Sequence, residues 1–309
     1  MTPKPDFDEP LEVIVRPVLS GDEIARLREL VAEVERVDGA SPLNEQAILK
    51  LRSGSPGVRH VLATVGDTLA GYVYVDTADR TQDASAELVV RPAFRRHGLG
   101  AVLVQTAVDS VAPGSLRLWA HGHHPGAARL AASLGFSRVR DLWLMRRALD
   151  EPLPAPDEVP GITVRTFEPG RDEDAWLAVN TRAFAHHPEQ GATTRADLEA
   201  RMAEPWFDPR GFFLAERDGS LLGFHWTKVH RGDADVGEVY VVGVDPDAQG
   251  MGLGRLLTTV GLRHLQQLGL PAAILYVESD NEAAIRVYER LGFVHESTDV
   301  MYLREDRDR

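Results

Sequence analysis

The sequence predicts an α/β protein made of two tandem domains, each with a mostly antiparallel mixed sheet flanked by helices. The chain has 309 residues, which is enough for two cores at about 150 residues each. A glycine loop occurs twice, as VRPAFRRHGLGA at residues 90–101 and VDPDAQGMGLGR at residues 244–255, half a chain apart. Strand and helix patterns also follow in the same order in both halves.

In the first half, a strand at residues 13–15 precedes helices, and apolar patterns predict strands at 60–65 and 69–75. A strand then leads into the first glycine loop, which opens an apolar-periodic helix. A strand at 116–120, another helix and a closing strand after LGF complete the half.

The second half repeats this order, with strands expected at 162–166, 211–216, 221–229 and 273–277. Between the halves lies DEPLPAPDEVPG, residues 150–161, whose four prolines block regular helix and sheet pairing. We therefore expect domains at residues 1–150 and 151–309, joined by this linker.

The composition excludes several functions. A net charge of −13 without a long basic stripe argues against nucleic acid as a partner. The absence of cysteine excludes disulfides, thiolate metal sites and cysteine nucleophiles. Apolar runs are too short to span a bilayer, and MTPKPDFDEP lacks a signal-peptide core. We expect a cytoplasmic monomer that binds neither nucleic acid nor membranes.

The glycine loops are suited to phosphate. Glycines allow close backbone approach, and the free N–H groups and dipole of the first helical turn favour an anion. A Rossmann site would need a third glycine where Leu103 and Leu257 stand. A P-loop is excluded, because no lysine precedes serine or threonine there.

The strand, V-x-P-x-x-[Arg/Gln]-x-x-G-x-G and helix together resemble the acetyl-CoA loop of the GNAT acetyltransferases. SDNEAAIRVYERLGF, residues 279–293, resembles their second hallmark, in which an Asn and a Tyr flank the thiol end of the cofactor. With AFAHHPEQG, GFHWTKVH and LYVESDN, the tandem arrangement resembles the mycothiol synthase family over nearly the whole chain. This resemblance implies acetyl transfer from acetyl-CoA, without a metal, to the cysteinyl amine of the pseudodisaccharide Cys-GlcN-Ins.

The resemblance also implies cofactor contacts in both halves. In the first half they are Leu88, Val89, Val90, Arg95, Arg96, His97, Gly98, Leu99, Gly100 and Ala101. In the second half they are Val242, Gly243, Val244, Gln249, Gly250, Met251, Gly252, Leu253, Gly254, Arg255, Asn281, Glu282, Ala283, Ala284, Ile285 and Arg286.

Direct attack of the amine in a ternary complex is expected, because the chain has neither cysteine nor a G-x-S-x-G elbow. Strand alternation predicts that Glu238, Tyr240, Val242 and Val244 share a face, with Glu238 two pleats back. An α-amino group has a reference pKa of about 8, so Glu238 acting through a water is an adequate base. The backbone N–H of Val242 or Val244 is the candidate oxyanion donor.

Tyr288 is the candidate acid for the leaving thiolate. Residues 281, 284, 285 and 288 share one helical face, and the small Ala284 leaves room for a ligand. A tyrosine on such a face is more often a core residue, and the family resemblance reverses that expectation.

The first half is expected to be a non-catalytic copy that keeps an acetyl-CoA loop. Aligning Val90 with Val244 places Ala84 at the position of Glu238, and aligning the LGF segments places Ala131 at that of Tyr288. Glu87 lies three positions further along, on the opposite face by strand period.

Substrate contacts follow from the resemblance alone, at Glu45, Glu189, Lys228, Glu238 and Tyr276. Carboxylates suit an amine and sugar hydroxyls, and a lysine donates to sugar oxygens. The histidine clusters HGHH and HPEQ lack a metal-binding pattern. Two alternatives remain: an N-acetyltransferase for another amine, such as an aminoglycoside or peptide N-terminus, and a non-enzymatic acyl-CoA sensor.

Overall fold

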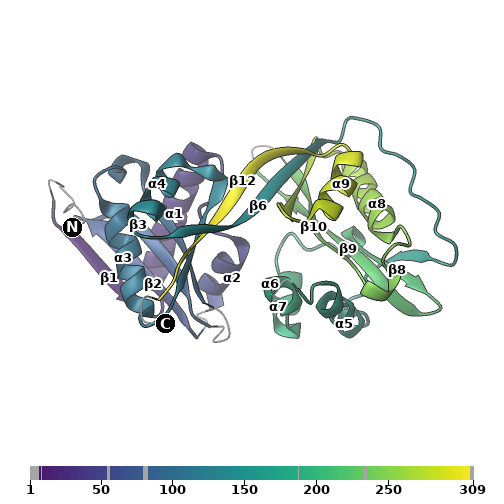
Figure 1. The fold of residues 1–309 in the computed structure, drawn as a ribbon, viewed down its shortest axis with the longest axis horizontal. Helices are drawn as coiled ribbons and strands as arrows, with labels where there is room; N and C mark the ends of the chain where they lie inside the picture. The colour runs from purple at the N-terminus through teal and green to yellow at the C-terminus, as the bar shows by residue number, and fades with distance from the viewer. Residues whose placement is uncertain are drawn as a thin grey trace. The chain divides into compact units, whose positions relative to one another are not determined.

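The computed structural model describes residues 7, 9–53, 56–78, 83–186, 188–232 and 235–306, of which 52, 53, 123, 188 and 189 are described by their backbone only. It divides into two compact units (Figure 1). Unit 1 comprises Met1–Leu142 with Ser297–Arg309, and unit 2 comprises Trp143–Glu296.

This division differs from the boundary expected at the proline-rich linker. The chain leaves unit 1 within β6 (Ser137–Ala148) and returns within β12 (Val294–Arg304). The last residues of β12 pair antiparallel with β5 (Leu116–Ala120), so backbone hydrogen bonds assign the C-terminal segment to unit 1. Residues 149–162, which include the linker, form no helix or strand.

Unit 1 is a sheet in the order β1-β2-β3-β4-β5-β12, antiparallel throughout except for the parallel pair β4–β5. Its remaining elements are β1 (Leu11–Arg16), α1 (Gly21–Asp38), α2 (Glu45–Ser53), β2 (Val58–Val65), β3 (Thr68–Asp76), β4 (Ala84–Val90), α3 (Leu99–Val111) and α4 (Pro125–Ser133). Strand alternation divides β2 between two cores: Val61 packs with α3, whereas Leu62 packs with α1.

Unit 2 is a sheet in the order β11-β10-β9-β8-β7, in which β10 and β11 are the parallel pair. Its elements are β7 (Thr163–Thr166), α5 (Glu173–Ala183), α6 (Pro188–Gly191), α7 (Arg195–Met202), β8 (Phe212–Arg217), β9 (Ser220–His230), β10 (Val236–Val244), α8 (Leu253–Gln267), β11 (Ala272–Glu278) and α9 (Glu282–Arg290). These elements confirm the predicted α/β class with mostly antiparallel sheets.

Helices cover both faces of the unit 2 sheet (Figure 1). On one face, which we call the α5 face, Trp176 of α5 and Leu198 of α7 pack on Phe212 and Trp226. On the other, the α8 face, helices α8 and α9 pack on strand residues that include Val239. Each strand therefore presents alternate side chains to two different cores.

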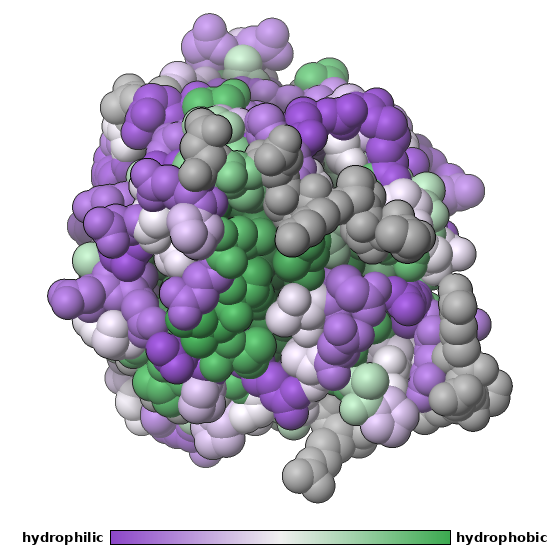
Figure 2. All heavy atoms as spheres, turned by 90° about the vertical axis from the view of Figure 1, so that its left-hand side faces the viewer, coloured by the Kyte–Doolittle hydropathy of each residue, from purple (hydrophilic) through white to green (hydrophobic). Residues whose placement is uncertain are grey.

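Figure 2 shows the face of the molecule on the side where β1 lies, with a band of apolar side chains surrounded by polar ones. β1 is an edge strand that pairs only with β2. Within the described ranges, no helix combines the length and apolar character needed to cross a membrane.

Candidate active site

A β-bulge in β10 determines which side chains reach the site. Glu238 pairs with Lys228 of β9, but the register then shifts between Val239 and Val241, which leaves Tyr240 as the extra residue. Such an insertion bends a strand and reverses the alternation of every later side chain.

The expectation that Glu238, Val242 and Val244 share a face was therefore wrong. Val242 packs against the core cluster beneath α9, and Val244 packs against the cluster beneath the start of α8, so both point to the α8 face. Glu238 lies on the α5 face with its cross-strand partner Lys228. The physical reason is the single inserted residue, Tyr240.

The α5 face brings together three of the predicted substrate residues. Lys228 and Glu238 stand directly opposite each other on β9 and β10, and Glu238 is in register with Ile274 of the parallel strand β11. Tyr276 lies two residues beyond Ile274, so it projects to the same face, where it is 45% exposed. Lys228, Glu238 and Tyr276 thus occupy adjacent strands.

Aromatic rings hold the Lys228 ammonium in place. Its Nζ lies 4.6 Å from the ring centre of Trp206 and 5.2 Å from that of Tyr240. The Tyr240 hydroxyl accepts a hydrogen bond of 2.9 Å from Nε of Arg201. Cation–π contacts of this kind stabilise a partly desolvated ammonium. Trp206 and Arg201 were not predicted from the sequence, because they come from the loop after α7 and from α7 itself.

Glu238 is buried and its carboxylate is hydrogen bonded. Nε2 of His230 lies 2.6 Å from Oε2 of Glu238. The side chain of Glu238 is 9% exposed, whereas that of His230 is 40% exposed. Sequence reasoning missed His230, although the hairpin gives a signal: His230 pairs with Val236, which places His230 on the face of Glu238.

Strands β10 and β11 separate just beyond Glu238. Their parallel register includes only Gly237 with Ala273 and Glu238 with Ile274, although β10 continues to Val244 and β11 to Glu278. The last backbone groups of β10 on that side therefore have no ladder partner on β11. This separation leaves the N–H groups near Val242 and Val244 as candidate donors to an oxyanion.

Tyr288 approaches the separated strands from the α8 face. On α9 it is half-buried in the same cluster as Val242 and Ala284, with its ring 5.9 Å from that of Phe293. Burial raises the pKa of Tyr288 to about 12, so the phenol keeps its proton at neutral pH. Asn281 caps α9, because its Oδ1 accepts the N–H of Ala284 at 3.1 Å. The candidate base and acid thus belong to opposite faces of the sheet.

The loop after β10 is held at its start by hydrogen bonds to a buried carboxylate, and the glycines at its end face open space. The buried Asp245 carboxylate accepts hydrogen bonds from Nε of Arg182 at 2.8 Å and from the N–H of Asp247 at 3.0 Å. Gly252 has φ 85° and begins α8. A Cβ added at Gly252 or Gly254 would meet no atom within 4 Å. The residues therefore fit a phosphate group that comes close to the backbone at a helix N-terminus.

Unit 1 keeps the backbone conformation of the loop, but side chains occupy the space beside Gly100. Gly98 has φ 82° and begins α3, and Arg96 adopts φ 69° where unit 2 has Gly250. A Cβ added at Gly100 would lie 3.2 Å from Cδ2 of Leu130 and 3.8 Å from Cγ2 of Val90. Apolar side chains thus pack against the glycine that corresponds to Gly254.

Strand register also corrects the alignment of the two halves. Gly71 pairs with Val90 as Gly223 pairs with Val244, but β4 has no bulge against β3. Ser85, opposite Asp76, therefore takes the place of Glu238, and not Ala84. Glu87, two residues from Ser85, lies on that same face rather than the opposite one, because only β10 contains the extra residue.

Glu87 is nevertheless buried, and both of its carboxylate oxygens have polar neighbours. It is 2% exposed, and its Oε2 accepts the N–H of Asn44 at 2.7 Å. Its Oε1 lies 3.9 Å from Nε2 of His121. Ala131, at the position of Tyr288, is buried in the core. Unit 1 therefore offers neither a solvent-reaching base nor an acid at the matching positions.

Two predicted substrate residues lie elsewhere in the chain. Glu45 is the first residue of α2 in unit 1. Glu189 lies in α6, and its side chain is outside the described set. No cluster of three or more metal-binding side chains occurs among the described residues.

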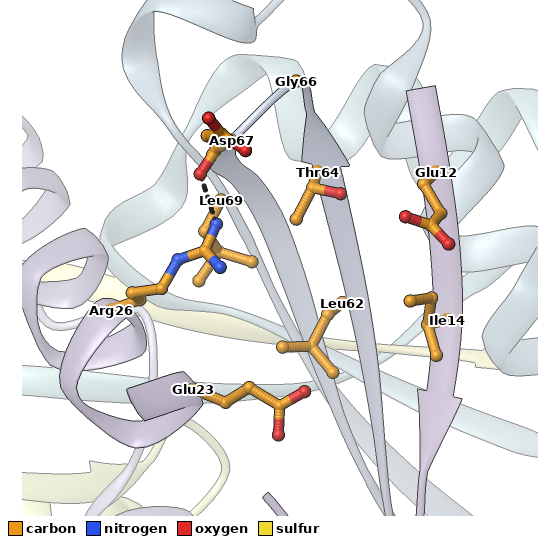
Figure 3. A pocket seen from close by; sticks show the side chains of 9 residues that line it. All are labelled: Glu12, Ile14, Glu23, Arg26, Leu62, Thr64, Gly66, Asp67 and Leu69. Atoms are coloured by element: carbon orange, nitrogen blue, oxygen red, sulfur yellow. Dashed lines mark hydrogen bonds between the residues drawn. The ribbon is translucent and has the colours of Figure 1, made fainter. Parts of the chain in front are cut away.

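A pocket of about 240 Å³ in unit 1 contains none of the predicted residues (Figure 3). It lies beside α1, β1 and β2, and two of its charged side chains make hydrogen bonds within the fold. Glu23 caps α1 in a box with Ser20, and Arg26 donates to the backbone oxygen of Asp67 at 2.5 Å. The pocket therefore belongs to the packing of α1.

Comparisons with known proteins agree with this geometry. Family models match twice: the acetyltransferase (GNAT) family over residues 176–293 and an acetyltransferase (GNAT) domain over residues 56–138. The chain is 56% identical over 289 residues to a mycothiol acetyltransferase of Thermobispora bispora, covering 92% of this chain and 96% of that protein. It is 54% identical to that of Streptomyces avermitilis, covering 93% of each.

Solved structures show the same fold. A GCN5-related N-acetyltransferase from Sphaerobacter thermophilus superposes with a TM-score of 0.70 at 26% identity, covering 96% of both chains. A tandem GNAT protein from the clavulanic acid biosynthesis pathway gives a TM-score of 0.75 at 20% identity, covering 96% of this chain and 99% of that one, and shows the fold alone.

Together these matches confirm an enzyme that transfers acetyl groups from acetyl-CoA. They also confirm the tandem arrangement and the resemblance found in the sequence. The chain belongs to the GNAT acetyltransferases, in the tandem-domain family of the mycothiol acetyltransferases.

Proposed function

We propose that this protein acetylates the cysteinyl amine of Cys-GlcN-Ins with acetyl-CoA, forming mycothiol and CoA by direct attack of the amine. One observation carries the proposal: the buried Glu238 and Lys228 share a face with the exposed Tyr276 beside the point where β10 and β11 separate. The open glycine loop follows at the end of the same strand.

The amine approaches from the α5 face. Glu238 removes its proton through a water, and the backbone N–H of Val242 or Val244 stabilises the developing oxyanion. Tyr288 protonates the departing thiolate from the α8 face, because its raised pKa keeps the phenol protonated until that step. Acetyl-CoA supplies the thioester, whose carbonyl is activated toward amines.

The cofactor is held by residues around the loop of unit 2, from Val242 to Val244 and from Gln249 to Arg255. Residues 281–286 contribute at the start of α9, where Asn281 fixes the helical turn. The corresponding segments of unit 1, residues 88–90 and 95–101, bind a second acetyl-CoA that does not react.

The substrate shell consists of carboxylates, one ammonium and one phenol. Lys228, held over two aromatic rings, donates to hydroxyls of the sugar or the inositol, and Tyr276 adds a hydroxyl on the neighbouring strand. The family resemblance of the sequence also implies Glu45 and Glu189 as substrate contacts. We infer a cytoplasmic monomer. Its net charge of −13 argues against nucleic acid and anionic membranes as partners, because it repels phosphate-rich surfaces.

An amine panel tests this function. CoA release is measured with Cys-GlcN-Ins, with GlcN-Ins lacking cysteine, with free cysteine, with an aminoglycoside and with a short peptide. We expect Cys-GlcN-Ins to have the highest kcat/KM by at least about tenfold, since lost polar contacts in a built site cost that much or more. A higher value for another amine would support the other N-acetyltransferase, and no CoA release with any amine would support the sensor.

A further inference from the structure

We propose that His230 is a positioning residue that orients Glu238 and passes the proton collected by Glu238 to solvent. The inference rests on the proposed function, in which Glu238 is the base. His230 is in neither predicted set of catalytic or substrate residues. The observation behind it is a hydrogen bond of 2.6 Å between the side chain of a buried carboxylate and that of an exposed histidine.

The reaction requires an exit for one proton in each turnover. At neutral pH the amine enters as R–NH3⁺, loses two protons and leaves as a neutral amide, while one proton ends on the thiol of CoA. The other proton must reach water, or Glu238 stays protonated and cannot act again. The side chain of Glu238 is only 9% exposed, and a bound substrate on the α5 face covers it further.

His230 provides that exit. While Glu238 is ionised, the Nε2–H group of His230 donates to Oε2. After Glu238 has taken up the proton, exchange with water moves the imidazole proton from Nε2 to Nδ1, and the Nε2 lone pair then accepts the proton of Glu238. The imidazolium releases its Nδ1 proton to water, which restores the starting Nε2–H tautomer. Histidine is suited to this step because either ring nitrogen of an imidazole can carry or accept a proton. No electrons move in this step, and the only bonds changed are O–H and N–H bonds.

The surrounding strands hold the pair in place. His230 is the last residue of β9, and the two residues that follow it, Arg231 and Gly232, both donate to Asp235. Strand register and alternation place Lys228 of β9 and Tyr276 and Glu278 of β11 on the same face as the pair. Arg201 reaches the same face from α7 through Tyr240. All of these groups belong to unit 2.

Two substitutions separate positioning from proton transfer. His230→Gln keeps an amide N–H near the position of Nε2 but cannot carry a proton, and His230→Ala removes both functions. The exposed His295 of β12, whose ring centre lies 4.8 Å from that of Trp143 in a tilted arrangement, supplies the control His295→Gln in the same unit. CoA release is measured against pH and against buffer concentration, with KM for both substrates.

We expect His230→Gln to lower kcat by about tenfold or more, with both KM values within about twofold of wild type. Its kcat should rise with buffer concentration, and added imidazole should restore part of the activity of His230→Ala. His295→Gln should match the wild type in every measurement.

Two results would overturn the proposal alone. One is a kcat for His230→Gln within twofold of wild type at every buffer concentration. The other is an equal loss in both variants, with raised KM and no response to buffer or imidazole, which would indicate a structural role. A Glu238→Gln variant with full activity would instead overturn the assignment of the base, and the proposal with it.

Discussion

At the scale of single residues, environment assigns the chemical roles. Glu238 and Tyr288 come from opposite faces of one sheet. Both side chains lie near the point where β10 separates from β11. In the proposed mechanism, this arrangement lets the amine lose its proton on one side of the sheet while the thiolate gains one on the other. Either side chain alone would pass for an ordinary strand or core residue.

Replacing Glu238 by Gln tests the base directly. The amide keeps the shape of the side chain and its contact with His230 but cannot accept the amine proton. We expect kcat to fall about 10²- to 10³-fold near pH 7 and to recover in part toward pH 9, where free amine predominates. CoA release from pH 6.5 to 9.5 is the measurement. A variant with the wild-type pH profile would show that the base is another group.

His225 makes stability depend on pH in a predictable direction. Complete burial lowers the pKa of His225 to about 4, and its Nδ1 lies 2.8 Å from the backbone oxygen of Leu257 on α8. The unfolded chain, with a pKa near 6.5, therefore binds the proton more readily than the folded one. The contribution of neutral His225 to the free energy of unfolding is complete above pH 6.5 and is lost as pH falls toward 4.

We expect the free energy of unfolding to decline between pH 6.5 and 4 by up to about 3 kcal/mol from this residue. Urea titrations at several pH values measure the slope. The variant His225→Leu should show a smaller decline over the same range, whatever its absolute stability. Equal slopes in the two proteins would exclude His225 as the source.

At the scale of elements, the glycine loop positions the cofactor in the proposed mechanism, and the bulge in β10 determines which side chains face the substrate. The loop was predictable because its motif occurs twice, beside strands with clear patterns. The bulge was not, because one inserted residue leaves the apolar pattern of VGEVYVVGV almost unchanged. Only the pairing of β10 with β9 reveals it, which explains why the predicted face of Val242 was wrong.

Substitution at Gly254 separates the ligand from the fold. Gly254 is in the first turn of α8, and a Cβ there meets no atom within 4 Å, so Gly254→Ala should keep or raise stability by up to about 1 kcal/mol. Gly254→Val should raise the KM for acetyl-CoA about tenfold or more, because the branched side chain enters the phosphate space. Initial rates and thermal unfolding are the measurements.

Gly100 provides the matched control in unit 1. Gly100→Ala is tight against Leu130, so a small loss of stability is expected, but turnover should remain within about twofold of wild type. Calorimetric titration with CoA reports binding to either loop. A folded Gly100 variant without turnover would contradict a non-catalytic unit 1.

At the scale of the whole molecule, the sequence predicts two α/β units but not their limits along the chain. The prolines of the linker mark a break in regular structure, whereas β12 returns to pair with β5 over a sequence separation that no local pattern indicates. The same limit applies to the site. Motifs identified Glu238, Tyr288 and the loops, whereas His230 and Trp206 depend on strand and loop contacts that short motifs do not encode.

A buried ionic cluster ties the C-terminal segment to unit 1. Asp299 of β12 accepts hydrogen bonds from His121 and from the N–H of Gly122, both at 2.8 Å. Burial alone would lower the pKa of His121, but the hydrogen bond to Asp299 and the charge of Glu87 raise it to about 10. The imidazolium is therefore present at neutral pH.

Breaking this cluster should destabilise the fold. Asp299→Ala leaves a buried imidazolium with one partner fewer. We expect the free energy of unfolding to fall by about 3 kcal/mol at pH 7. The pKa of His121 is higher in the folded protein than in the unfolded chain. The stability that protonated His121 contributes is therefore complete below pH 6.5 and is lost as pH rises toward 10. Urea unfolding at pH 6 and pH 9.5 checks both statements, with the exposed Glu296→Gln as control. An Asp299→Ala variant as stable as wild type would refute the anchoring role.

The central claim is that the amine of Cys-GlcN-Ins attacks acetyl-CoA directly in the ternary complex, without an acetylated protein. Initial rates of CoA release over a matrix of both substrate concentrations test it most directly. Direct attack predicts double-reciprocal lines that intersect. Parallel lines, the pattern of a ping-pong reaction through an acetyl-enzyme, would contradict the account.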